Sequence, residues 1–479
     1  MSNCLESGIE FYGDFRLPYF PCWLQCNLKN SNECGDKPMN HGKLTDTRKN
    51  PEHKTISCRL NNLAITVEKE GSRHFTKASF PMRFGYYSEI RTSEYEFHFN
   101  LNGDIKFIRG LNVTWPHPSE SLKRTDGNDW GYYTVGAVIK QKGIIDWFGE
   151  YYLPCLTYPS NAFWDYNPYT DAHISHVFAA WSQLYAKLYD IQCNGVPSGI
   201  KDFLSMVVHK DENTLFAQSE ELHAIIGGRV SVLPPDTRHV DYELIPLNIA
   251  EGCLYHCKFC CVKSRESYQP RSRDNIILQM ERLKTFYGRN LANYNALFLG
   301  NHDALGAGDE LICMAASEAY RFFGFENSNM KKPMLFLFGS VGSLLKSGNG
   351  LFEKLSNLPF YTMINIGLES VDEQTLASIN KPLKISMIRE AFKKMLEINR
   401  SYANIEITAN FLLGEQFLPG HTHSLIELLR DVPDSSDKKG AIYLSPLMDN
   451  QKRGELLNSF FEIKKMSRLP AFIYLIQRL

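Results

Sequence analysis

The stretch that decides the fold is Asp241–Cys261, DYELIPLNIAEGCLYHCKFCC. Its first half has the apolar composition of a strand, and Glu251-Gly252 then predicts a turn. Three cysteines follow, Cys253, Cys257 and Cys260, so the spacing is Cys-x3-Cys-x2-Cys. Spacings of four and three residues let the thiolates of one tight loop reach a common centre. The loop is therefore a candidate metal site.

Three thiolates fit more than one kind of site. A structural zinc ion needs a fourth ligand, which His256 or Cys261 could supply. A [4Fe–4S] cluster usually takes four cysteines, so a site with three leaves one iron open to a ligand that is not protein. Buried cysteines that bind no metal are the third alternative. The loop by itself leaves all three open.

Composition excludes several classes of protein. The chain of 479 residues has net charge −1, so it has no strong electrostatic reason to bind nucleic acid or anionic lipid. The amino terminus is acidic and is not a signal peptide, and no run of about eighteen apolar residues predicts a membrane span. Twelve cysteines in this length are not a disulfide-dense secreted pattern. We expect a cytoplasmic protein of roughly two to four domains, with neither a nucleic-acid nor a membrane partner.

Residues 1–235 differ from the rest in being rich in aromatic residues and turn dipeptides. Glu94–Arg109 alternates on either side of Asn102-Gly103 and predicts a β-hairpin. Gly227-Gly228 ends a helical run, and Pro234-Pro235 predicts a linker. We predict one α+β domain here, a candidate substrate-recognition module. Further strands are expected within Leu60–Glu68 and Trp130–Ile145, and helices over Asp171–Asp190, Lys201–His209 and Leu215–Ile226.

A second group of cysteines lies near the amino terminus. Cys22, Cys26 and Cys34 could hold a second cluster or a zinc ion, with Cys4 or Cys58 as a fourth ligand. Their spacings of four and eight residues match no metal motif, and a loop whose cysteines bind nothing explains them equally well. Whether they bind a metal stays open.

Many polar residues follow the segment Trp115-Pro116-His117-Pro118, among them Lys123-Arg124, Asp126 and Asp129. A loop that faces the substrate is one interpretation. A loop fixed by proline, with charges solvated by water, is the other, and we favour it.

After the cysteine loop, short apolar strands alternate with helices. Such strands are buried on both faces and form a parallel sheet with right-handed crossovers. Six units are too few for a closed eightfold barrel, so we predict an α/β fold, a partial (β/α)6 barrel over 236–479 with a short tail. Its active site should lie at the carboxyl ends of the strands. The expected strands are Tyr242–Ile249, Ala296–Gly300, Pro333–Phe338, Tyr361–Ile366, Ile405–Leu413 and Ala441–Leu444, and the helices Asn275–Phe286, Asp309–Phe323, Val341–Leu355, Asp372–Ile379, Ser386–Asn399, Thr422–Arg430 and Glu455–Met466.

The cysteine loop and the strand ends together resemble the radical S-adenosylmethionine (SAM) enzymes. The fourth strand ends in Gly367-Leu368-Glu369-Ser370, similar to a signature of the branch with anaerobic coproporphyrinogen dehydrogenases and the elongator tRNA-modifying subunit. The resemblance covers residues 240–466. It implies that the three cysteines hold a [4Fe–4S] cluster whose fourth iron binds the amino and carboxylate groups of SAM. A zinc site would not explain the motifs at the strand ends.

The same resemblance assigns SAM-binding residues. Phe259 would contact the adenine, and Glu369 and Ser370 would lie beside the ribose and carboxylate. The second strand ends in Gly300-Asn301-His302-Asp303, where the family commonly has a glycine-rich segment closing with Glu that contacts the SAM amino group. This chain keeps one glycine and offers Asn301 and Asp303 in place of that Glu. The expected cofactor-binding residues are Phe259, Gly300, Asn301, Asp303, Glu369, Ser370, Leu413, Gly414, Leu444 and Ser445.

The resemblance also implies the chemistry. One electron from the reduced cluster cleaves SAM to methionine and a 5′-deoxyadenosyl radical, which abstracts hydrogen from an unreactive carbon. A flavodoxin- or ferredoxin-like donor would supply the electron. The substrate, a small molecule or a peptide, cannot be read from the sequence. A cluster-containing regulatory protein without turnover and a zinc-stabilised binding module remain as alternatives.

Two further expectations concern the surroundings of this site. His421 and His423 could donate protons there, but after Pro419-Gly420 we expect them to face solvent. Six β–α units cannot close on themselves, so an opening near Cys253 needs a cover that excludes water. We expect the amino-terminal domain to provide this cover.

We predict that Cys253, Cys257 and Cys260 are cluster ligands and that Cys261 is not, because two adjacent cysteines cannot easily direct both sulfurs at one metal. Each is replaced by Ala, and iron is counted after anaerobic reconstitution. The first three variants should lose the cluster, and Cys261→Ala should keep it. The assignment is wrong if Cys261→Ala loses iron and Cys260→Ala retains it.

Overall fold

The structure is a computed structural model. It describes residues 54–74, 83–111, 121–134, 138–139, 144–145, 149–152, 172–191, 195–239, 243–260, 266–414, 419–433, 439–446 and 453–474. The chain divides into two compact units, Met1–Glu52 and His53–Leu479, and all described residues belong to the second. Cys4, Cys22, Cys26, Cys34, Trp115, His117 and Cys261 lie outside the described residues. None of the described helices is long and apolar enough to cross a membrane.

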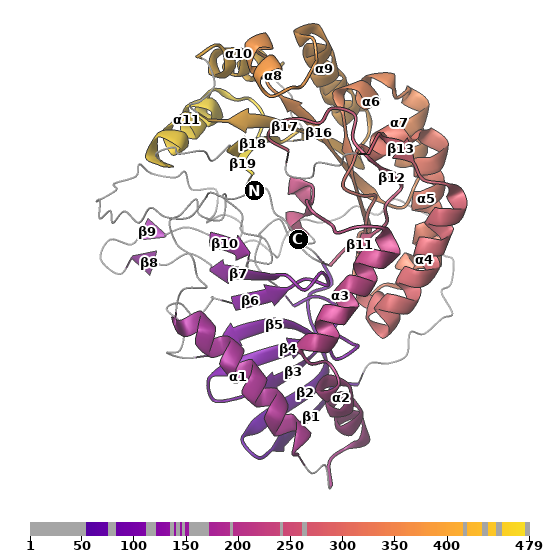
Figure 1. The fold of residues 1–479 in the computed structure, drawn as a ribbon, viewed down its shortest axis with the longest axis vertical. Helices are drawn as coiled ribbons and strands as arrows, with labels where there is room; N and C mark the ends of the chain where they lie inside the picture. Colours follow the sequence, from indigo (N-terminus) through magenta and orange to yellow (C-terminus); the bar gives the residue numbers. More distant parts are fainter. Residues whose placement is uncertain are drawn as a thin grey trace, which may run out of the picture. The chain divides into compact units, whose positions relative to one another are not determined.

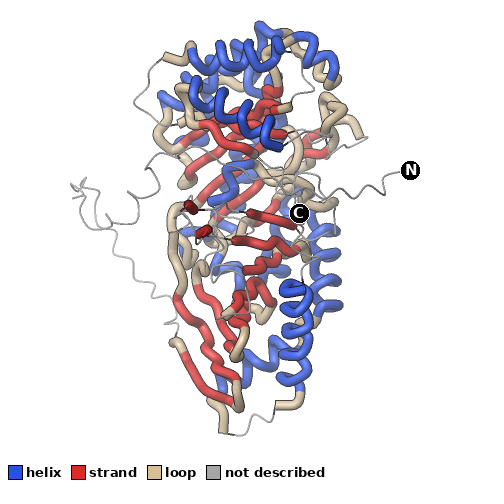
Figure 2. Tube along the Cα trace, turned by 90° about the vertical axis from the view of Figure 1, so that its left-hand side faces the viewer, coloured by secondary structure: helices blue, strands red, loops and turns tan. Residues whose placement is uncertain are grey.

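A parallel sheet with helices on its outer side forms the second half of this unit (Figure 1). Neighbouring strands are all parallel, and the sheet lies beneath the helices in the second view (Figure 2). The predicted α/β partial barrel is therefore confirmed. The strands follow one another in chain order: β11 (Ile245–Pro246), β14 (Ala296–Phe298), β15 (Met334–Gly339), β16 (Tyr361–Glu369), β17 (Ile405–Leu413), β18 (Ile442–Pro446) and β19 (Ala471–Ile473).

The helices outside the sheet bury one apolar side. In α9, Ile388, Phe392 and Met395 recur at helical spacing and are buried in the same core as the strands. The helix expected over Val341–Leu355 is two helices, because Gly348 separates them as the N-cap of the second. The helices are α4 (Arg273–Tyr287), α5 (Asp309–Phe322), α6 (Val341–Lys346), α7 (Asn349–Ser356), α8 (Glu373–Ser378), α9 (Ile385–Ser401), α10 (Pro419–Arg430) and α11 (Arg453–Met466).

The last strand, β19, was not predicted. It lies in the expected carboxyl-terminal tail and consists of three residues paired with β18. Three residues are too few to show a period, so its place in the sheet comes from pairing and not from local pattern.

An antiparallel sheet precedes the barrel, as the α+β prediction required. Apolar residues of one face, such as Ile65, Phe97 and Leu122, share a core with α1 (Ala172–Tyr189) and α2 (Ser198–Val208). The predicted hairpin at Asn102-Gly103 is confirmed, since β4 pairs with β5 around it. The strands are β1 (Ile56–Leu60), β2 (Leu63–Glu70), β3 (Tyr86–Arg91), β4 (Tyr95–Phe99), β5 (Ile105–Gly110), β6 (Ser121–Arg124), β7 (Trp130–Thr134) and β10 (Gly149–Tyr152), and β8 (Val138–Ile139) pairs with β9 (Ile144–Ile145).

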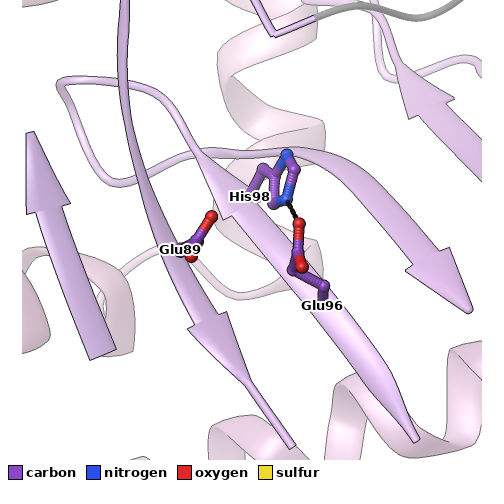
Figure 3. A group of neighbouring side chains, drawn as sticks. All are labelled: Glu89, Glu96 and His98. Atoms are coloured by element: carbon purple, nitrogen blue, oxygen red, sulfur yellow. Dashed lines mark hydrogen bonds and ion pairs between the residues drawn. The ribbon is translucent and has the colours of Figure 1, made fainter. Parts of the chain in front are cut away.

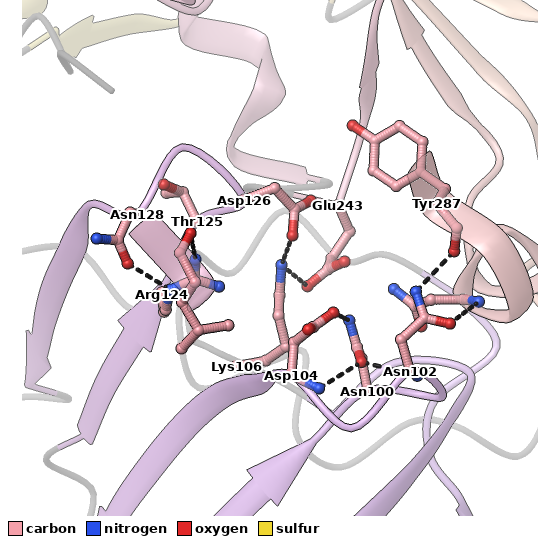
Figure 4. Close-up of polar contacts among 12 residues, drawn as sticks. Asn100, Asn102, Asp104, Lys106, Arg124, Thr125, Asp126, Asn128, Glu243 and Tyr287 are labelled. Carbon is pink, nitrogen blue, oxygen red and sulfur yellow. Dashed lines mark hydrogen bonds and ion pairs between the residues drawn. The ribbon is translucent and has the colours of Figure 1, made fainter. Parts of the chain in front are cut away.

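Buried polar contacts join this sheet to the barrel (Figure 4). Lys106 Nζ lies 2.8 Å from Asp126 Oδ1 and 3.8 Å from Glu243, and the Tyr294 hydroxyl donates to Asp126 Oδ2 at 2.7 Å. Asn102 donates to the Tyr287 carbonyl oxygen at 2.8 Å. Tyr287 and Tyr294 precede β14, and Glu243 precedes β11. These contacts therefore lie at the amino ends of the strands, away from the end where the site is expected.

The charges after Trp115 are therefore not solvated, and our preferred interpretation of them was wrong. Lys123, Arg124 and Asp129 are buried. Burial lowers the pKa of Arg124, while nearby carboxylates including Asp126 oppose that shift. A buried charge is tolerated only when it is paired. Arg124 donates to Asn128 Oδ1 and to the Leu215 carbonyl oxygen, and Asp129 lies 3.9 Å from Arg229.

The helix α3 (Glu212–Ile226) belongs to both parts. Leu215 packs in the core of the antiparallel sheet, whereas Leu222 and Ile226 pack in the core of the barrel. Gly227 ends the helix in a left-handed conformation, with φ 74°, as the sequence predicted.

We call the segment that follows α3, residues 229–239, the strap. The predicted linker Pro234-Pro235 lies in it and is buried, and its second proline begins the 3-10 helix η4 (Pro235–His239). The strap accepts hydrogen bonds from residues that follow two distant strands of the sheet, β14 and β19. Asn301, after β14, donates to the Arg229 carbonyl oxygen at 2.8 Å, and the Tyr474 hydroxyl, after β19, donates to the Leu233 carbonyl oxygen.

The carboxylate of Asp236 anchors the strap to β17 and β18, the fifth and sixth strands of the parallel sheet. The Thr408 hydroxyl on β17 donates to Oδ2 at 2.8 Å, and the Tyr443 hydroxyl on β18 donates to Oδ1. Asp236 is only 2% exposed. A buried carboxylate depends on its donors because it has lost its hydration. The strap is thus part of the packed barrel and not a flexible connection.

We predict that Tyr443→Phe destabilises the protein by about 1–3 kcal/mol, because the buried Asp236 carboxylate loses a donor. Urea unfolding measures the change. Tyr189→Phe makes the same chemical change at a side chain that is 79% exposed and should have no measurable effect. Equal stabilities of the two variants would contradict the structural role of the strap.

Candidate functional site

The cysteine loop leaves and returns to a short antiparallel pair. β12 (Ala250–Glu251) pairs with β13 (Gln269–Pro270), and the Cys253 N–H donates to the Glu266 carbonyl oxygen at 3.2 Å. Gly252 has φ 78°, and a Cβ there would lie 2.1 Å from the Ser267 carbonyl oxygen. Only glycine fits this position. Glu251 is the last residue of β12 and not part of the predicted turn, and Gly252 alone closes the base of the loop.

Within the loop Cys257 and Cys260 share one turn, whereas Cys253 forms a β-bridge with Ser267 at the base of the loop. The three sulfur atoms are not all within 4.8 Å of one another in this structure. Cys257 is buried and Cys253 and Cys260 are half-buried, and the Cys260 N–H donates to the Cys257 carbonyl oxygen at 3.2 Å. Burial raises the pKa of Cys257, and the charge of Cys253 adds to this effect, whereas Lys381 opposes it. Thiolate charges at Cys253 and Cys257 thus repel each other, and a bound cation would relieve that repulsion. His256, the alternative zinc ligand, has an exposed side chain.

Lys381 is a residue of this site that our sequence reasoning missed. Its ammonium group is buried, donates to the Gly367 carbonyl oxygen at 2.6 Å and lies 3.0 Å from Glu369 Oε1. It also lies 5.6 Å from the centre of the Tyr255 ring in the cysteine loop. Burial lowers the pKa of Lys381, but the charges of Glu369 and Cys257 outweigh burial and raise it overall. The only sequence signal was a lysine between α8 and Pro382, which has no functional meaning alone.

The Gly-Leu-Glu segment at the end of β16 has a physical explanation. A Cβ at Gly367 would lie 2.4 Å from Glu369 Oε1, so glycine makes room for the folded-back carboxylate. Glu369 has φ 67°, at a register shift between β16 and β17. This left-handed conformation costs a non-glycine residue about 1–2 kcal/mol. The ion pair with Lys381 holds Glu369 in this bulge.

Ser370, the residue after Glu369, lies in the protein interior. It is buried, its Oγ is 2.7 Å from His421 Nδ1, and it accepts from the Asp372 N–H at 3.1 Å. His421 Nε2 lies 2.9 Å from the Leu412 carbonyl oxygen. The expectation that His421 faces solvent was wrong, because α10 begins at Pro419 and turns this side chain inward. His423 is exposed, as expected, and lies 3.2 Å from Glu427.

At the end of β14 the polar side chains present unused acceptors. Asp303 Oδ1 accepts from Ser343 Oγ at 2.7 Å and from the N–H groups of Gly306 and Ser340. Its Oδ2 and the side-chain oxygens of Asn248 and Asn301 are buried without a hydrogen-bond partner among the described residues. Such acceptors are costly to leave unsatisfied. A ligand with N–H donors would satisfy them.

The remaining predicted residues lie on adjacent strand ends. Phe411 pairs with Leu444, and Leu412 pairs with Ser445. Leu413, Leu444 and Ser445 are buried, Gly414 is half-buried, and Phe259 packs partly buried against the barrel core. Because the side chains of Leu444 and Ser445 are enclosed, these two residues would meet a ligand through their backbone groups.

A second titratable cluster lies on the antiparallel sheet (Figure 3). Glu89, Glu96 and His98 each offer a ligand atom within 4.8 Å of the others. Lys69 lies 3.0 Å from Glu89, Arg83 lies 3.6 Å from Glu96, and His98 Nε2 bonds Glu96. Burial would raise the pKa of Glu96, but His98, Arg83 and Arg109 outweigh burial and lower it to about 2. The cluster is therefore already neutralised by its own cations.

A comparison with known protein families bears on the predicted resemblance. Residues 247–417 match the family model of the radical SAM superfamily, which confirms it. Similar solved structures include a radical SAM methyltransferase from Sphaerobacter thermophilus, with TM-score 0.34, 15% identity and coverage of 48% of this chain and 66% of that one. Another is methylornithine synthase (PylB), with TM-score 0.29, 12% identity and coverage of 55% and 63%. In each case less than two thirds of the other chain is matched. No curated protein matches this sequence.

We predict that Lys381→Met destabilises the protein by about 3–5 kcal/mol, because it leaves the buried Glu369 carboxylate without its cation. Urea unfolding of the metal-free protein is the measurement. The control is Lys393→Met, which removes an exposed ion pair with Glu397 and should cost about 0–1 kcal/mol. If both variants unfold alike, Glu369 and Lys381 do not form the buried pair described above.

Proposed function

We propose that this chain is a radical SAM enzyme that uses a [4Fe–4S] cluster held by Cys253, Cys257 and Cys260. The match of residues 247–417 to the superfamily supports the class of protein. The observation that carries the proposal is local. Three thiols in one short loop lie beside a buried Glu369–Lys381 pair at the carboxyl ends of a parallel sheet, with Cys257 and Cys260 on one turn.

The three cysteines fit the cluster by ligand type, although their sulfur atoms are not all within 4.8 Å of one another in this structure. Thiolates are the usual ligands of iron–sulfur clusters, and the three cysteines come from one loop closed at its base by Gly252. A fixed ammonium group at Lys381 lowers the electrostatic cost of a thiolate at Cys257. Tyr255 and Lys258 bring the loop against the α8 region, since Lys258 donates to the Ile379 carbonyl oxygen at 3.0 Å.

The strand ends fit SAM in charge and in hydrogen-bonding capacity. The unsatisfied oxygens of Asn301 and Asp303 are acceptors, which suits the amino group of SAM. Lys381 is the buried cation of the site and suits a carboxylate. Glu369 remains our candidate for the ribose hydroxyls, and Phe259, Leu413 and Gly414 for the adenine. Ser370 would act indirectly, by supporting Glu369, because its buried hydroxyl is hydrogen-bonded to His421.

The chain's own residues would bind, orient and shield these groups. When bound, the cluster and SAM supply one-electron chemistry that removes hydrogen from an unreactive carbon. The strap excludes water next to β17 and β18, because the side chains of Asp236, Thr408 and Tyr443 are hydrogen-bonded to one another there. We further propose a flavodoxin- or ferredoxin-like electron donor, a small-molecule or peptide substrate, and a reducing, cytoplasmic location.

The proposal predicts that anaerobically reconstituted protein binds iron and, with a chemical reductant, converts SAM to 5′-deoxyadenosine and methionine. Glu369→Gln keeps the shape of the side chain and removes its charge. It should weaken SAM binding by about 10- to 100-fold in calorimetry, the scale of one charge-assisted hydrogen bond. Iron content should not change.

Glu397→Gln, on an exposed face of α9, is the matched control and should bind SAM normally. A protein that holds zinc in the cysteine loop, without an iron–sulfur absorbance band, would favour the binding-module alternative. A protein with an intact cluster that forms no 5′-deoxyadenosine would favour a regulatory role without turnover.

A further inference from the structure

His421 joins two neighbouring strand ends of the proposed cofactor site. β16 and β17 pair in parallel as far as Glu369 and Phe411. One residue further along each strand, His421 contacts Ser370 through Nδ1 at 2.7 Å and the Leu412 carbonyl oxygen through Nε2 at 2.9 Å. The imidazole therefore ties the two strands together just beyond the end of their regular pairing.

The hydrogen bonds around His421 define one tautomer. The Leu412 carbonyl oxygen can only accept, so Nε2 must carry the hydrogen. Burial lowers the pKa of His421, although Leu412 and Asp372 oppose this, so the ring is neutral near pH 7 and Nδ1 accepts. The Ser370 hydroxyl must then donate to Nδ1, while its oxygen accepts from the Asp372 N–H. The result is a directed chain from Asp372 through Ser370 and His421 to Leu412.

This chain of hydrogen bonds holds the strained part of the site. Glu369, in the left-handed conformation, directly precedes Ser370. At the other end Asp372 caps α8 by accepting from the Thr375 N–H at 2.8 Å, and α8 leads to Lys381, the partner of Glu369. Both charges of the buried pair thus depend on where Ser370 and Asp372 lie.

We propose that His421 is a positioning residue that sets the affinity of the site for SAM by holding Ser370, and through it the Glu369 bulge; this inference rests on the function proposed above. His421 is not a catalytic residue, because it is 2% exposed and its two ring nitrogens contact Ser370 and Leu412. If His421 only filled space, the effects of changing His421 and Ser370 on SAM affinity would be independent of each other. If it positions Ser370, the two effects would not add.

His421→Gln is the informative change. Its amide nitrogen can still donate toward the Leu412 carbonyl oxygen, but the acceptor for Ser370 is lost. Ser370→Ala removes the same hydrogen bond from the other side, and the double variant completes a cycle. His423→Gln is the matched control, since it lies two residues further on the same helix, is exposed and forms an exposed ion pair with Glu427.

Calorimetry with SAM on anaerobically reconstituted protein is the measurement, with iron content and thermal unfolding recorded for each variant. We expect SAM affinity about tenfold weaker in His421→Gln and in Ser370→Ala, the scale of one lost hydrogen bond. The double variant should be no weaker than either single one. The KM for SAM should rise, the rate of SAM cleavage at saturation should stay within about twofold of the original, and His423→Gln should match the original protein.

Wild-type affinity in a folded His421→Gln protein overturns the inference, and so do additive losses in the double variant. If His421→Gln does not fold, the smaller change Ser370→Ala decides in the same way. The unmodified protein separates this inference from the proposed function. If it binds no SAM, the proposed function fails and the inference falls with it, whereas normal binding leaves only the role of His421 in question.

Discussion

The buried ion pair between Glu369 and Lys381 is the interaction on which the rest of the site depends. Each charge would be costly in the interior without the other. Pairing them fixes the end of β16, requires glycine at 367, and brings the segment after α8 against the cysteine loop. The pair also places a cation beside Cys257. One electrostatic constraint thus links a strand and the helix that follows it to the candidate cluster loop, which lies much earlier in the sequence.

Local sequence patterns predicted the helices and strands of this fold better than they predicted which residues are buried and what those residues contact. The apolar strands from Ala296 to Leu444 and most helices lie where the sequence placed them, because buried strands and amphipathic helices carry their own periodicity. The motifs also located the strand ends that lie together. Lys381 was missed and His421 was wrongly placed in solvent, because their importance comes from burial and from partners such as Glu369 and Ser370. Neither burial nor a partner distant in sequence leaves a local pattern.

The region before the barrel shows the same limit. Its hairpins and helices were readable, yet the positions of its charges were not. Lys106, Asp126 and Tyr294 look like ordinary surface residues in sequence, and their burial follows only from the contact between the antiparallel sheet and the amino ends of β11 and β14. The strap reaches β17 and β18, and cover of the site near Cys253 by the amino-terminal domain stays a prediction.

The strap has a consequence for how this protein becomes folded. Asp236 meets Tyr443, 207 residues later, and Leu233 meets Tyr474, 241 residues later. Contacts of such long range carry a large loop-closure cost and slow folding. During synthesis, the segment around Asp236 leaves the ribosome long before its partners exist. The part of the sheet that packs against the strap therefore stays incomplete until β18 and β19 have been made. During that interval the apolar surface of the unfinished sheet must be kept from aggregating.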